Sequence, residues 1–453
     1  MKVVKFGGSS LASGEQVEKV FDIVVSDPER KIVVVSAPGK RFAEDRKVTD
    51  LLIEIGEKCL QGQDAPEYTA AVIARYAQLA EELKLGHEIV SNIEKNLQQL
   101  LNGNQSNPAR YIDAIKASGE DNNAKLIAAY FKSKGIEASY INPKDAGLIV
   151  KEIGGTAQVL EKSYKNLQSL KNLPGILIFP GFFGYNEDGE VVTFSRSGSD
   201  ITGSILANGT GAGLYENFTD VDAVYSVNPN VVPNPKEIRE LTYKEMRELS
   251  YAGFSVFHDE ALIPAFKAGI PVHIKNTNNP QADGTRIVNE RKHTNGPVIG
   301  IASDDDFCSI YVNKYLMNKE VGFGRKLLSI IEEFGLTYEH SPSGIDDLSI
   351  ILRQKQMDAE TEKKILERIY SDLHPDEVKV EHNLSLIMMV GEGMRHNIGT
   401  AARASKALAD AGVNIEMINQ GSSEVSMMFG VKEAQEKKAV QALYAEFFVG
   451  VYA

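Results

Sequence analysis

The sequence predicts an α/β protein: an open, mainly parallel sheet sandwiched by helices, followed by two smaller α+β units. Over the first 290 residues, strand-like apolar stretches such as 31–36 and 175–179 alternate with amphipathic stretches. This alternation is typical of parallel sheets with crossover helices. Farther on, a strand–helix–strand–helix layout occurs twice in succession, in units of about 75 residues. A single α+β domain with accidental symmetry is the alternative to this duplication.

Composition bounds the class of protein. The chain has 453 residues, too many for one ordinary core, and its formal net charge of −13 disfavours a nucleic-acid surface. Cys59 and Cys308 are the two cysteines, so neither a disulfide framework nor a cysteine metal site is expected. The start lacks the apolar region of a signal peptide, and no apolar run is long enough for a bilayer. We expect a cytoplasmic protein without membrane or nucleic-acid partners.

Periodicity gives the elements of the first part in order. Strands are predicted at 3–4, 31–36, 138–141, 175–179, 191–193, 213–217 and 270–275, and helices at 14–25, 48–60, 66–101 and twice within 109–134, with a break at Ser118-Gly119. Ligands of open parallel sheets bind at the carboxyl ends of the strands. The turns that follow strands are therefore where we expect the chemistry.

The second part begins after a turn-rich, polar stretch near residue 290, where we place a linker. Strands are predicted at 298–302, 307–312, 348–352, 384–390 and 425–431, and helices at 322–334, 359–373, 398–411 and 436–447.

The first turn, Lys5-Phe-Gly-Gly-Ser-Ser10, follows a short strand and precedes a helix. Adjacent glycines allow close approach of the backbone to a ligand, and successive N–H groups before a helix can bind an anion. Lys5 adds a positive charge, so the turn suits phosphate binding. A tight strand-to-helix turn with a surface lysine is the alternative. The spacing matches neither the Rossmann nor the Walker motif.

Three later stretches carry candidate charges. Glu120 follows Ser118-Gly119 and could bind an ammonium group or a metal, or could merely be a first-turn acid behind an N-cap serine. Arg196 could pair with a carboxylate, and Asp200 could orient a lysine or hold Mg²⁺ through water; a helix cap is the alternative. Lys275 ends a strand and could flank a phosphate opposite Lys5.

A pair of acids, Asp220 and Asp222, follows the strand 213–217. Their spacing suits a contact to Mg–nucleotide or ribose, and a solvated loop is the alternative. Tyr225 could pack on an adenine, although a lone tyrosine is more often part of a core or rim.

These pieces, in this order, resemble aspartokinases of the amino-acid kinase superfamily with C-terminal tandem ACT domains, over nearly the whole chain. The resemblance rests on Lys5-Phe-Gly-Gly-Ser-Ser10, Val48-Thr-Asp-Leu51, Ser118-Gly-Glu120, Arg196-Ser-Gly-Ser-Asp200, Thr219-Asp-Val-Asp222, Ile270-Pro-Val-His-Ile-Lys-Asn-Thr277 and Asn419-Gln-Gly-Ser-Ser-Glu424. Each motif is modest alone, but the set with its spacing is highly specific.

The resemblance implies phosphorylation of the β-carboxylate of L-aspartate by ATP with Mg²⁺, the first step of lysine, threonine and methionine biosynthesis. It implies that Lys5 and Asp200 are catalytic. It assigns aspartate binding to Thr49, Glu120, Arg196 and Ser199, and nucleotide binding to Lys5, Gly7, Gly8, Ser9, Thr219, Asp220, Tyr225 and Lys275. No protein metal site is expected.

Three positions depart from the family pattern. Ser197 stands where the family often has glycine, Asn230 where an arginine often contacts ATP, and Asn278 where some relatives have lysine. Lys275 is the candidate for supplying the missing charge.

The resemblance also implies the domains: a catalytic domain at 1–290, a first ACT domain at 307–380, and a second ACT domain from 297–306 plus 381–453. ACT domains are βαββαβ modules that bind amino acids at subunit interfaces. A homodimer or homotetramer and feedback inhibition by lysine, threonine or both are therefore expected. The expected effector pocket consists of Met317, Phe323, Tyr338, Glu339 and Ser343.

Two other functions remain open. The chain could be another carboxylate kinase of the superfamily, acting on glutamate or acetylglutamate, although such kinases are not expected to carry this tail. It could also be a non-catalytic amino-acid sensor with a degenerate kinase domain. Retention of Lys5, Glu120, Arg196 and Asp200 argues against the sensor.

Overall fold

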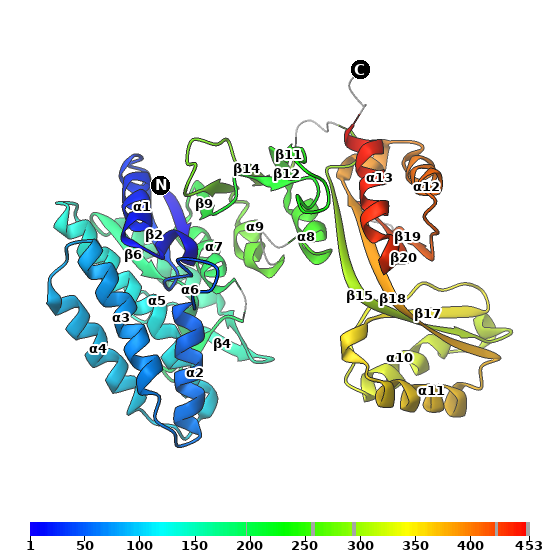
Figure 1. The fold of residues 1–453 in the computed structure, drawn as a ribbon, viewed down its shortest axis with the longest axis horizontal. Coiled ribbons are helices and arrows are strands. Elements are labelled where there is room, and N and C mark those ends of the chain that lie inside the picture. Colours follow the sequence, from blue (N-terminus) through cyan, green and yellow to red (C-terminus); the bar gives the residue numbers. More distant parts are fainter. Residues whose placement is uncertain (196, 255–258, 292–295, 422–424, 450–453) are drawn as a thin grey trace. The chain divides into compact units, whose positions relative to one another are not determined.

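The structure is a computed structural model that describes residues 1–195, 197–254, 259–291, 296–421 and 425–449 (Figure 1). The chain divides into two compact units. The first contains Met1–Val224, Glu237–Met246 and Ser255–Arg291, and the second contains Tyr225–Lys236, Arg247–Phe254 and Lys292–Ala453. Two short segments, 225–236 and 247–254, thus group with the C-terminal part of the chain.

An eight-stranded sheet forms the centre of the first unit, in the order β12-β14-β13-β9-β1-β2-β6-β3. In that order the strands are Glu240–Thr242, Thr285–Val288, Val272–Asn276, Leu214–Thr219, Lys2–Phe6, Arg30–Val35, Ile176–Pro180 and Ala138–Tyr140. Every neighbouring pair is parallel except β13 with β14. The predicted mainly parallel sheet is confirmed.

Helices cover both faces of this sheet. One face carries α1 (Gly14–Val25), α2 (Val48–Leu60), α3 (Pro66–Glu82), α4 (His87–Leu101) and α5 (Pro108–Ser133). On the other face, α7 (Gly198–Thr210) packs on β1, β2 and β9, with α6 (Glu161–Leu167) and α9 (Ile263–Ala268) beside it. This part of the chain also contains two hairpins, β4–β5 (Val150–Ile153 and Thr156–Val159) and β7–β8 (Phe183–Tyr185 and Val191–Thr193). The short pair β10–β11 (Val224–Tyr225 and Glu237–Ile238) and α8 (Tyr243–Tyr251) contain residues of both units.

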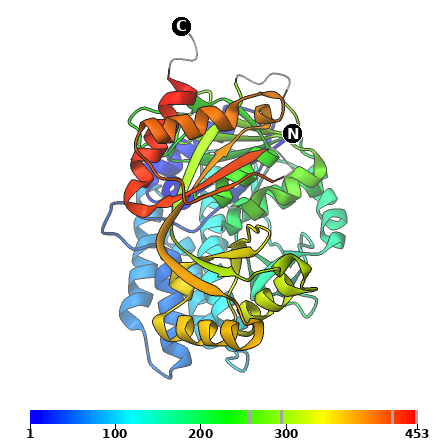
Figure 2. The ribbon, with the colours of Figure 1, turned by 90° about the vertical axis from the view of Figure 1, so that its right-hand side faces the viewer.

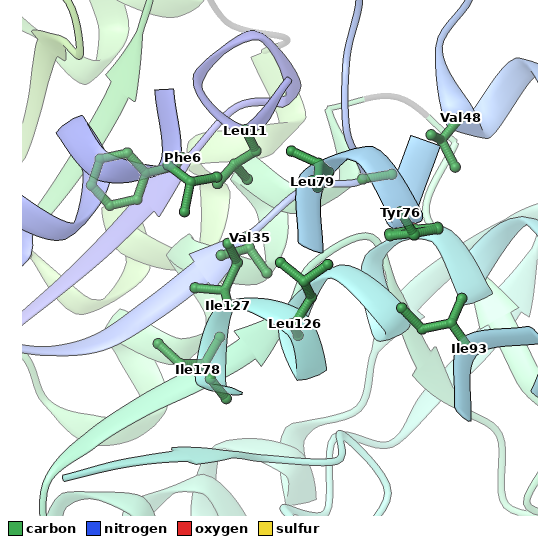
Figure 3. Close-up of a cluster of buried hydrophobic side chains, with 14 of the residues drawn as sticks. Phe6, Leu11, Val35, Val48, Tyr76, Leu79, Ile93, Leu126, Ile127 and Ile178 are labelled. Carbon is green, nitrogen blue, oxygen red and sulfur yellow. The ribbon is translucent and has the colours of Figure 1, made fainter. Parts of the chain in front are cut away.

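The main core lies between the sheet and α1–α5. Figure 3 shows Phe6 of β1, Val35 of β2 and Ile178 of β6 in one buried cluster with Leu126 and Ile127 of α5. Successive side chains of a strand point to opposite faces. Because Phe6 faces this core, Lys5 must face α7. The hydrophobic pattern of β1 therefore decides where the lysine goes.

The predicted helix break at Ser118-Gly119 is wrong, because α5 runs through both residues. The Ser118 hydroxyl donates to the Ile115 carbonyl (2.6 Å), so it caps nothing. A Cβ on Gly119 would lie 3.1 Å from Leu52 Cδ1 and 3.0 Å from Ala37 Cβ. The glycine is explained by close packing of α5 on α2, which offsets its helix penalty of about 1 kcal/mol. The stretch predicted to be helical over 66–101 consists of two helices, α3 and α4.

The second unit is built on a six-stranded sheet in the order β16-β17-β15-β18-β20-β19, with all neighbours antiparallel. Its strands are β15 (Gly300–Asn313), β16 (Tyr338–His340), β17 (Asp347–Arg353), β18 (Glu377–Val390), β19 (Met417–Asn419) and β20 (Ser426–Lys432). One half carries α10 (Phe323–Glu333) and α11 (Ala359–Leu373), and the other carries α12 (Thr400–Asp410) and α13 (Glu436–Phe448).

Two long strands, β15 and β18, run through both halves of this sheet (Figures 1 and 2). The later part of β15 pairs with β17, and the later part of β18 pairs with β20. In each strand one residue adopts the left-handed conformation, Asp306 (φ 67°) and Asn383 (φ 57°), where the halves meet. Aspartate and asparagine tolerate this conformation better than other non-glycine residues. The predicted pair of small α+β units is confirmed.

Candidate active site

Lys5 forms a buried ion pair with Asp200. Its Nζ lies 2.7 Å from Oδ1 of Asp200, which is in the first turn of α7. The same oxygen accepts a hydrogen bond of 2.6 Å from Nδ2 of Asn217 on β9. Lys5 is only 8% exposed, so the carboxylate offsets the desolvation of the ammonium and fixes its position. The predicted role of Asp200 in orienting a lysine fits this contact.

The glycine turn that follows Lys5 packs against the turn after β2. The Gly39 N–H donates to the Gly8 carbonyl (2.9 Å), and a Cβ on Gly39 would lie 2.5 Å from the Gly8 carbonyl carbon. Only glycine permits this approach. A Cβ on Gly7 would lie 3.4 Å from Lys5 Nζ, so the ammonium lies directly beside the turn. The Ser10 hydroxyl is 2.7 Å from that of Thr277, which follows β13.

Glu120 is buried on α5 and has one unpartnered oxygen. Its Oε1 accepts a hydrogen bond from the Ala37 N–H (3.1 Å), whereas Oε2 has no partner among the described residues. Burial raises the pKa of the Glu120 carboxyl to about 8, although the Ala37 N–H opposes this shift. Nearby on α5, Asn123 Nδ2 donates to the Ser36 carbonyl (2.7 Å). The helix thereby holds both polar groups of the Ser36–Ala37 peptide, which follows β2.

A cleft of about 590 Å³ brings many of the predicted residues together. Gly8, Ser9, Thr49, Glu120, Thr219 and Asp220 all line it. These residues come from the ends of β1 and β9 and from the helices α2 and α5. Lys5 and Asp200 are not part of this lining and lie beside it, next to Gly7. The site therefore forms at the carboxyl ends of the parallel strands, as expected for such sheets.

Two residues near the start of α7 were predicted to hold aspartate. Ser199 is buried and packs against Gly181, where a Cβ would lie 2.4 Å from the Ser199 hydroxyl. Arg196 lies outside the described residues, as do residues 422–424 of the C-terminal motif. Ser197 is the N-cap of α7 and has a left-handed backbone (φ 48°, ψ 32°), a conformation that glycine adopts more readily than serine.

Lys275 is not brought together with Lys5. It pairs in register with Phe218, which pairs with Phe6, so its side chain faces the opposite side of the sheet from Lys5. Burial lowers the pKa of the Lys275 ammonium, and the nearby Glu216 carboxylate opposes that shift. Lys19 on α1 instead donates to Asn278 Oδ1 (3.2 Å), at the position that is lysine in some relatives.

Other predicted nucleotide contacts lie outside the cleft. Asp222 accepts a hydrogen bond from Asn276 Nδ2 (2.8 Å), so it braces the chain after β9 and β13. Tyr225 lies on β10 and, like Asn230, belongs to the second unit. The contact of Tyr225 with a nucleotide stays a prediction.

Sequence reasoning missed several residues of this region. Asn217 shares Asp200 with Lys5, and the turn after β2 contributes Lys40, Arg41 and Lys47 to the cleft. The cluster of cations directly after Ala37-Pro38-Gly39 was the available signal, because it follows a buried strand. Nothing in the sequence signalled Asn217, whose role depends on the pairing of β9 with β1.

The predicted effector residues lie in the second unit. Met317 and Phe323 are buried in the core under α10 and α11. Tyr338 is exposed on β16, and Glu339 accepts a hydrogen bond from the Tyr251 hydroxyl and lies 3.5 Å from Arg353 Nε. Ser343 lines a cavity of about 980 Å³ along β15, β17 and β18. The five residues do not line that cavity together, and the effector pocket stays a prediction.

The geometry suits transfer of a phosphoryl group between anions. Such a reaction needs positioning and charge neutralisation more than covalent chemistry. The buried ammonium and glycine turn can hold phosphate oxygens, and the free oxygen of Glu120 can hold a cationic group of a second ligand. Within the described ranges, no three His, Cys, Asp or Glu side chains form a metal-binding group, and no helix could span a membrane.

Comparison with known families agrees with this geometry. Residues 1–276 match the amino acid kinase family, and residues 387–447 match an ACT domain. Aspartokinase 3 of Bacillus subtilis (strain 168) is 71% identical over 451 residues, covering 100% of this chain and 99% of that protein.

Solved structures show the same fold. The aspartate kinase of Clostridium acetobutylicum, described as an allosteric enzyme, is 38% identical with a TM-score of 0.88, covering 99% of this chain and 100% of that one. Aspartokinase III of E. coli, solved with aspartate and ADP, is 24% identical with a TM-score of 0.78, covering 99% of this chain and 100% of that one. At that identity the likeness shows the fold alone.

Proposed function

Because the chain belongs to the aspartokinases of the amino acid kinase family, we propose that it transfers the γ-phosphoryl group of ATP to the β-carboxylate of L-aspartate. The products are 4-phospho-L-aspartate and ADP. One observation supports this most strongly. The glycine turn beside the Lys5–Asp200 pair lines the same cleft as Glu120, and one carboxyl oxygen of Glu120 has no hydrogen-bond partner among the described residues.

The transfer step follows from the position of Lys5. An oxygen of the aspartate β-carboxylate attacks the γ-phosphorus while the bond from that phosphorus to the β–γ bridging oxygen breaks, and ADP leaves with the electron pair. The Lys5 ammonium stabilises the negative charge on the moving group. Asp200, which also accepts from Asn217, keeps the ammonium in place throughout. No side chain needs to form a covalent intermediate.

Aspartate recognition rests on Glu120. Its free Oε2 would accept a hydrogen bond from the α-ammonium of aspartate, and the buried surroundings strengthen that interaction. Thr49, in the first turn of α2, lines the same cleft. Ser199 and Arg196 are proposed to hold the α-carboxylate, since a guanidinium can bind a carboxylate through two parallel hydrogen bonds.

Nucleotide binding is assigned to the glycine turn and the chain after β9. Gly7, Gly8 and Ser9 would offer backbone N–H groups to the phosphates, and Thr219 and Asp220 line the same cleft. Tyr225 and Lys275 remain candidates from the family pattern alone. Mg²⁺ would enter with ATP, because it is commonly bound by phosphates with few protein ligands, and it would neutralise phosphate charge.

An assay of ADP release tests the proposal. The purified chain is incubated with MgATP and, separately, L-aspartate, L-glutamate or N-acetyl-L-glutamate, and an acyl-hydroxamate assay identifies the acyl phosphate. We expect turnover with aspartate alone. Preferred turnover of glutamate or acetylglutamate would assign another carboxylate kinase, and the absence of turnover on all three would favour a non-catalytic sensor.

The C-terminal unit is proposed to regulate this activity. We assign 1–290 to catalysis, 307–380 to a first ACT domain, and 297–306 plus 381–453 to a second. The pairing of the start of β15 with the later part of β18 supports this division. Lysine, threonine or both would inhibit as end products of the pathway that the reaction begins. Dimers or tetramers would form through the ACT domains, and sedimentation at several protein concentrations measures them.

A further inference from the structure

Arg75 is a buried charge that none of the roles above uses. It lies on α3 and is only 5% exposed. Its Nη1 donates to Oδ2 of Asp45 (2.6 Å), and its Nη2 donates to the carbonyl of Gly39 (2.6 Å). Both partners belong to the segment 38–47, which lines the cleft between the end of β2 and the start of α2. Nη2 also donates a longer hydrogen bond to the Ala12 carbonyl (3.5 Å). The two short contacts of this buried guanidinium therefore both go to one wall of the cleft.

Asp45 joins this guanidinium to a second one. Its carboxylate accepts hydrogen bonds from the N–H (3.0 Å) and Nε (2.8 Å) of Arg41 as well as from Arg75. Arg41 chiefly, and Arg75 in addition, hold the pKa of the Asp45 carboxyl well below its ordinary value. The segment is therefore pinned at Gly39 and at Asp45. Lys40 and Lys47, which line the cleft, have no carboxylate partner among the described residues.

The contact at Gly39 continues to the glycine turn. The carbonyl of Gly39 is held by Arg75, and its N–H donates to the carbonyl of Gly8 (2.9 Å). Because a Cβ on Gly39 would overlap the Gly8 backbone, the two turns cannot shift independently. A displacement of Gly39 must therefore move Gly8 and Ser9, which line the cleft.

We propose that Arg75 is a positioning residue for phosphoryl transfer. Through Gly39 it fixes the glycine turn, and through Asp45 it fixes the cationic segment 38–47 over the same cleft. This inference rests on the proposed function, in which the glycine turn binds the phosphates of ATP. Arg75 would act by placing that turn and would not contact the substrate itself. A displacement of about 1 Å in a reacting geometry can lower a rate roughly 100-fold.

The chain offers a matched control in the Arg30–Glu216 pair. Arg30 also forms a buried pair, with its Nε 2.7 Å from Glu216 Oε2. Neither residue lines the cleft. Arg30→Lys keeps the positive charge beside Glu216, so it should report the loss of stability from weakening a buried forked contact and leave the lining of the cleft unchanged.

The experiment compares Arg75→Lys, Asp45→Asn and Arg30→Lys with the wild-type chain. A single ammonium cannot reproduce both forked contacts of Arg75. We expect kcat/KM of Arg75→Lys to fall about 10- to 100-fold at a temperature where thermal melting shows the protein folded. Arg30→Lys should lower Tm to a similar extent and keep kcat and KM within twofold. Asp45→Asn changes a part-exposed side chain, and its kcat/KM should also fall below that of the wild-type chain.

Calorimetric titration with MgADP keeps the inference separate from the proposed function. We expect Arg75→Lys and Asp45→Asn to bind MgADP at least threefold more weakly than wild type and Arg30→Lys, whichever substrate is phosphorylated. If both cleft variants bind MgADP as wild type does and turn over at the wild-type rate, Arg75 is merely structural. If Arg30→Lys loses as much MgADP affinity and activity as Arg75→Lys does, the conclusion is the same. Should Arg75→Lys fail to fold, Asp45→Asn alone decides by the same criteria.

Discussion

Lys5 and Asp200 meet at 2.7 Å although one ends a strand and the other begins a helix far along the chain. The contact forms because the register of β1 turns Lys5 toward α7, whose first turn carries Asp200. The same carboxylate oxygen is shared with Asn217. The Lys5 ammonium is thus held by a carboxylate on a helix, and a neighbouring strand fixes that carboxylate through Asn217.

Removing this ammonium should abolish most of the activity. We expect Lys5→Met to lower kcat by roughly 10²- to 10³-fold, since a fixed donor to developing charge contributes on that order. Asp200→Asn should lower kcat less, because the ammonium remains but loses its charged partner. Lys132→Met, at an exposed site at the end of α5, is the control. Steady-state ADP release measures all three, and a Lys5→Met rate close to wild type contradicts the assigned role.

Aspartate affinity should depend on pH through Glu120. Burial raises the pKa of this carboxyl to about 8 in the empty cleft, so it is protonated below that pH. Binding an ammonium needs the ionised form, and the carboxyl must first lose its proton. The Kd for aspartate should therefore rise up to about tenfold for each pH unit below 8 and level off above it.

Glu120→Gln provides the control for this pH dependence. The amide cannot ionise, so the variant should bind aspartate weakly and without the slope between pH 6 and 8. Calorimetry in two buffers of different ionisation enthalpy should also detect the release of about one proton on binding to wild type at pH 7. A flat wild-type profile would show that Glu120 does not hold the ammonium.

A methyl group at Gly39 should disrupt the cleft by pushing apart the two backbone turns that line it. A Cβ there would lie 2.5 Å from the Gly8 carbonyl carbon, so both turns must move. We expect Gly39→Ala to lower the free energy of unfolding by about 1–3 kcal/mol, as overpacking generally does, and to reduce activity strongly. Gly86→Ala, where nothing lies within 4 Å of the added carbon, should do neither. Urea unfolding together with kinetics distinguishes the two variants.

Glycine at position 197 should stabilise the chain. Ser197 has φ 48°, a region that costs a non-glycine residue about 1–2 kcal/mol. After the extra backbone entropy of glycine is subtracted, Ser197→Gly should raise the free energy of unfolding by ~0.5 kcal/mol or more. Ser26→Gly, at φ −69°, should bring no gain. Equal responses of the two variants in chemical denaturation would argue against a strained Ser197.

Feedback inhibition should depend on Glu339. Wild-type activity at low aspartate should fall as lysine and threonine are added, separately and together. Loss of a charged hydrogen-bond acceptor is worth roughly 1.5–3 kcal/mol, so Glu339→Ala should raise the half-inhibitory concentration by tenfold or more. Glu367→Ala, an exposed acid on α11, should leave that concentration unchanged. Inhibition that is identical in wild type and Glu339→Ala would remove this residue from the effector site.

The local pattern of apolar residues was enough to predict the helices whose periodicity is strong. The predicted bounds of α1, α2 and α11 agree with the structure residue for residue, because each has a continuous apolar face, which in α2 outweighs the interior Gly56. Gly119 misled the prediction for α5, because its reason is tertiary: α2 lies against it. Lys275 shows the same limit, since strand pairing, not its position at a strand end, sets the face it occupies.

The sequence by itself determined the strongly periodic strands and helices, the family, and the residue types needed for phosphoryl transfer, because these depend on local periodicity and short motifs. Only the tertiary structure decided which of those residues share a cleft, that Asn217 and Arg75 support them, and that Glu120 is a buried acid with one free oxygen. Those properties depend on which side chains strand register and helix packing place side by side, and on how much water that packing removes.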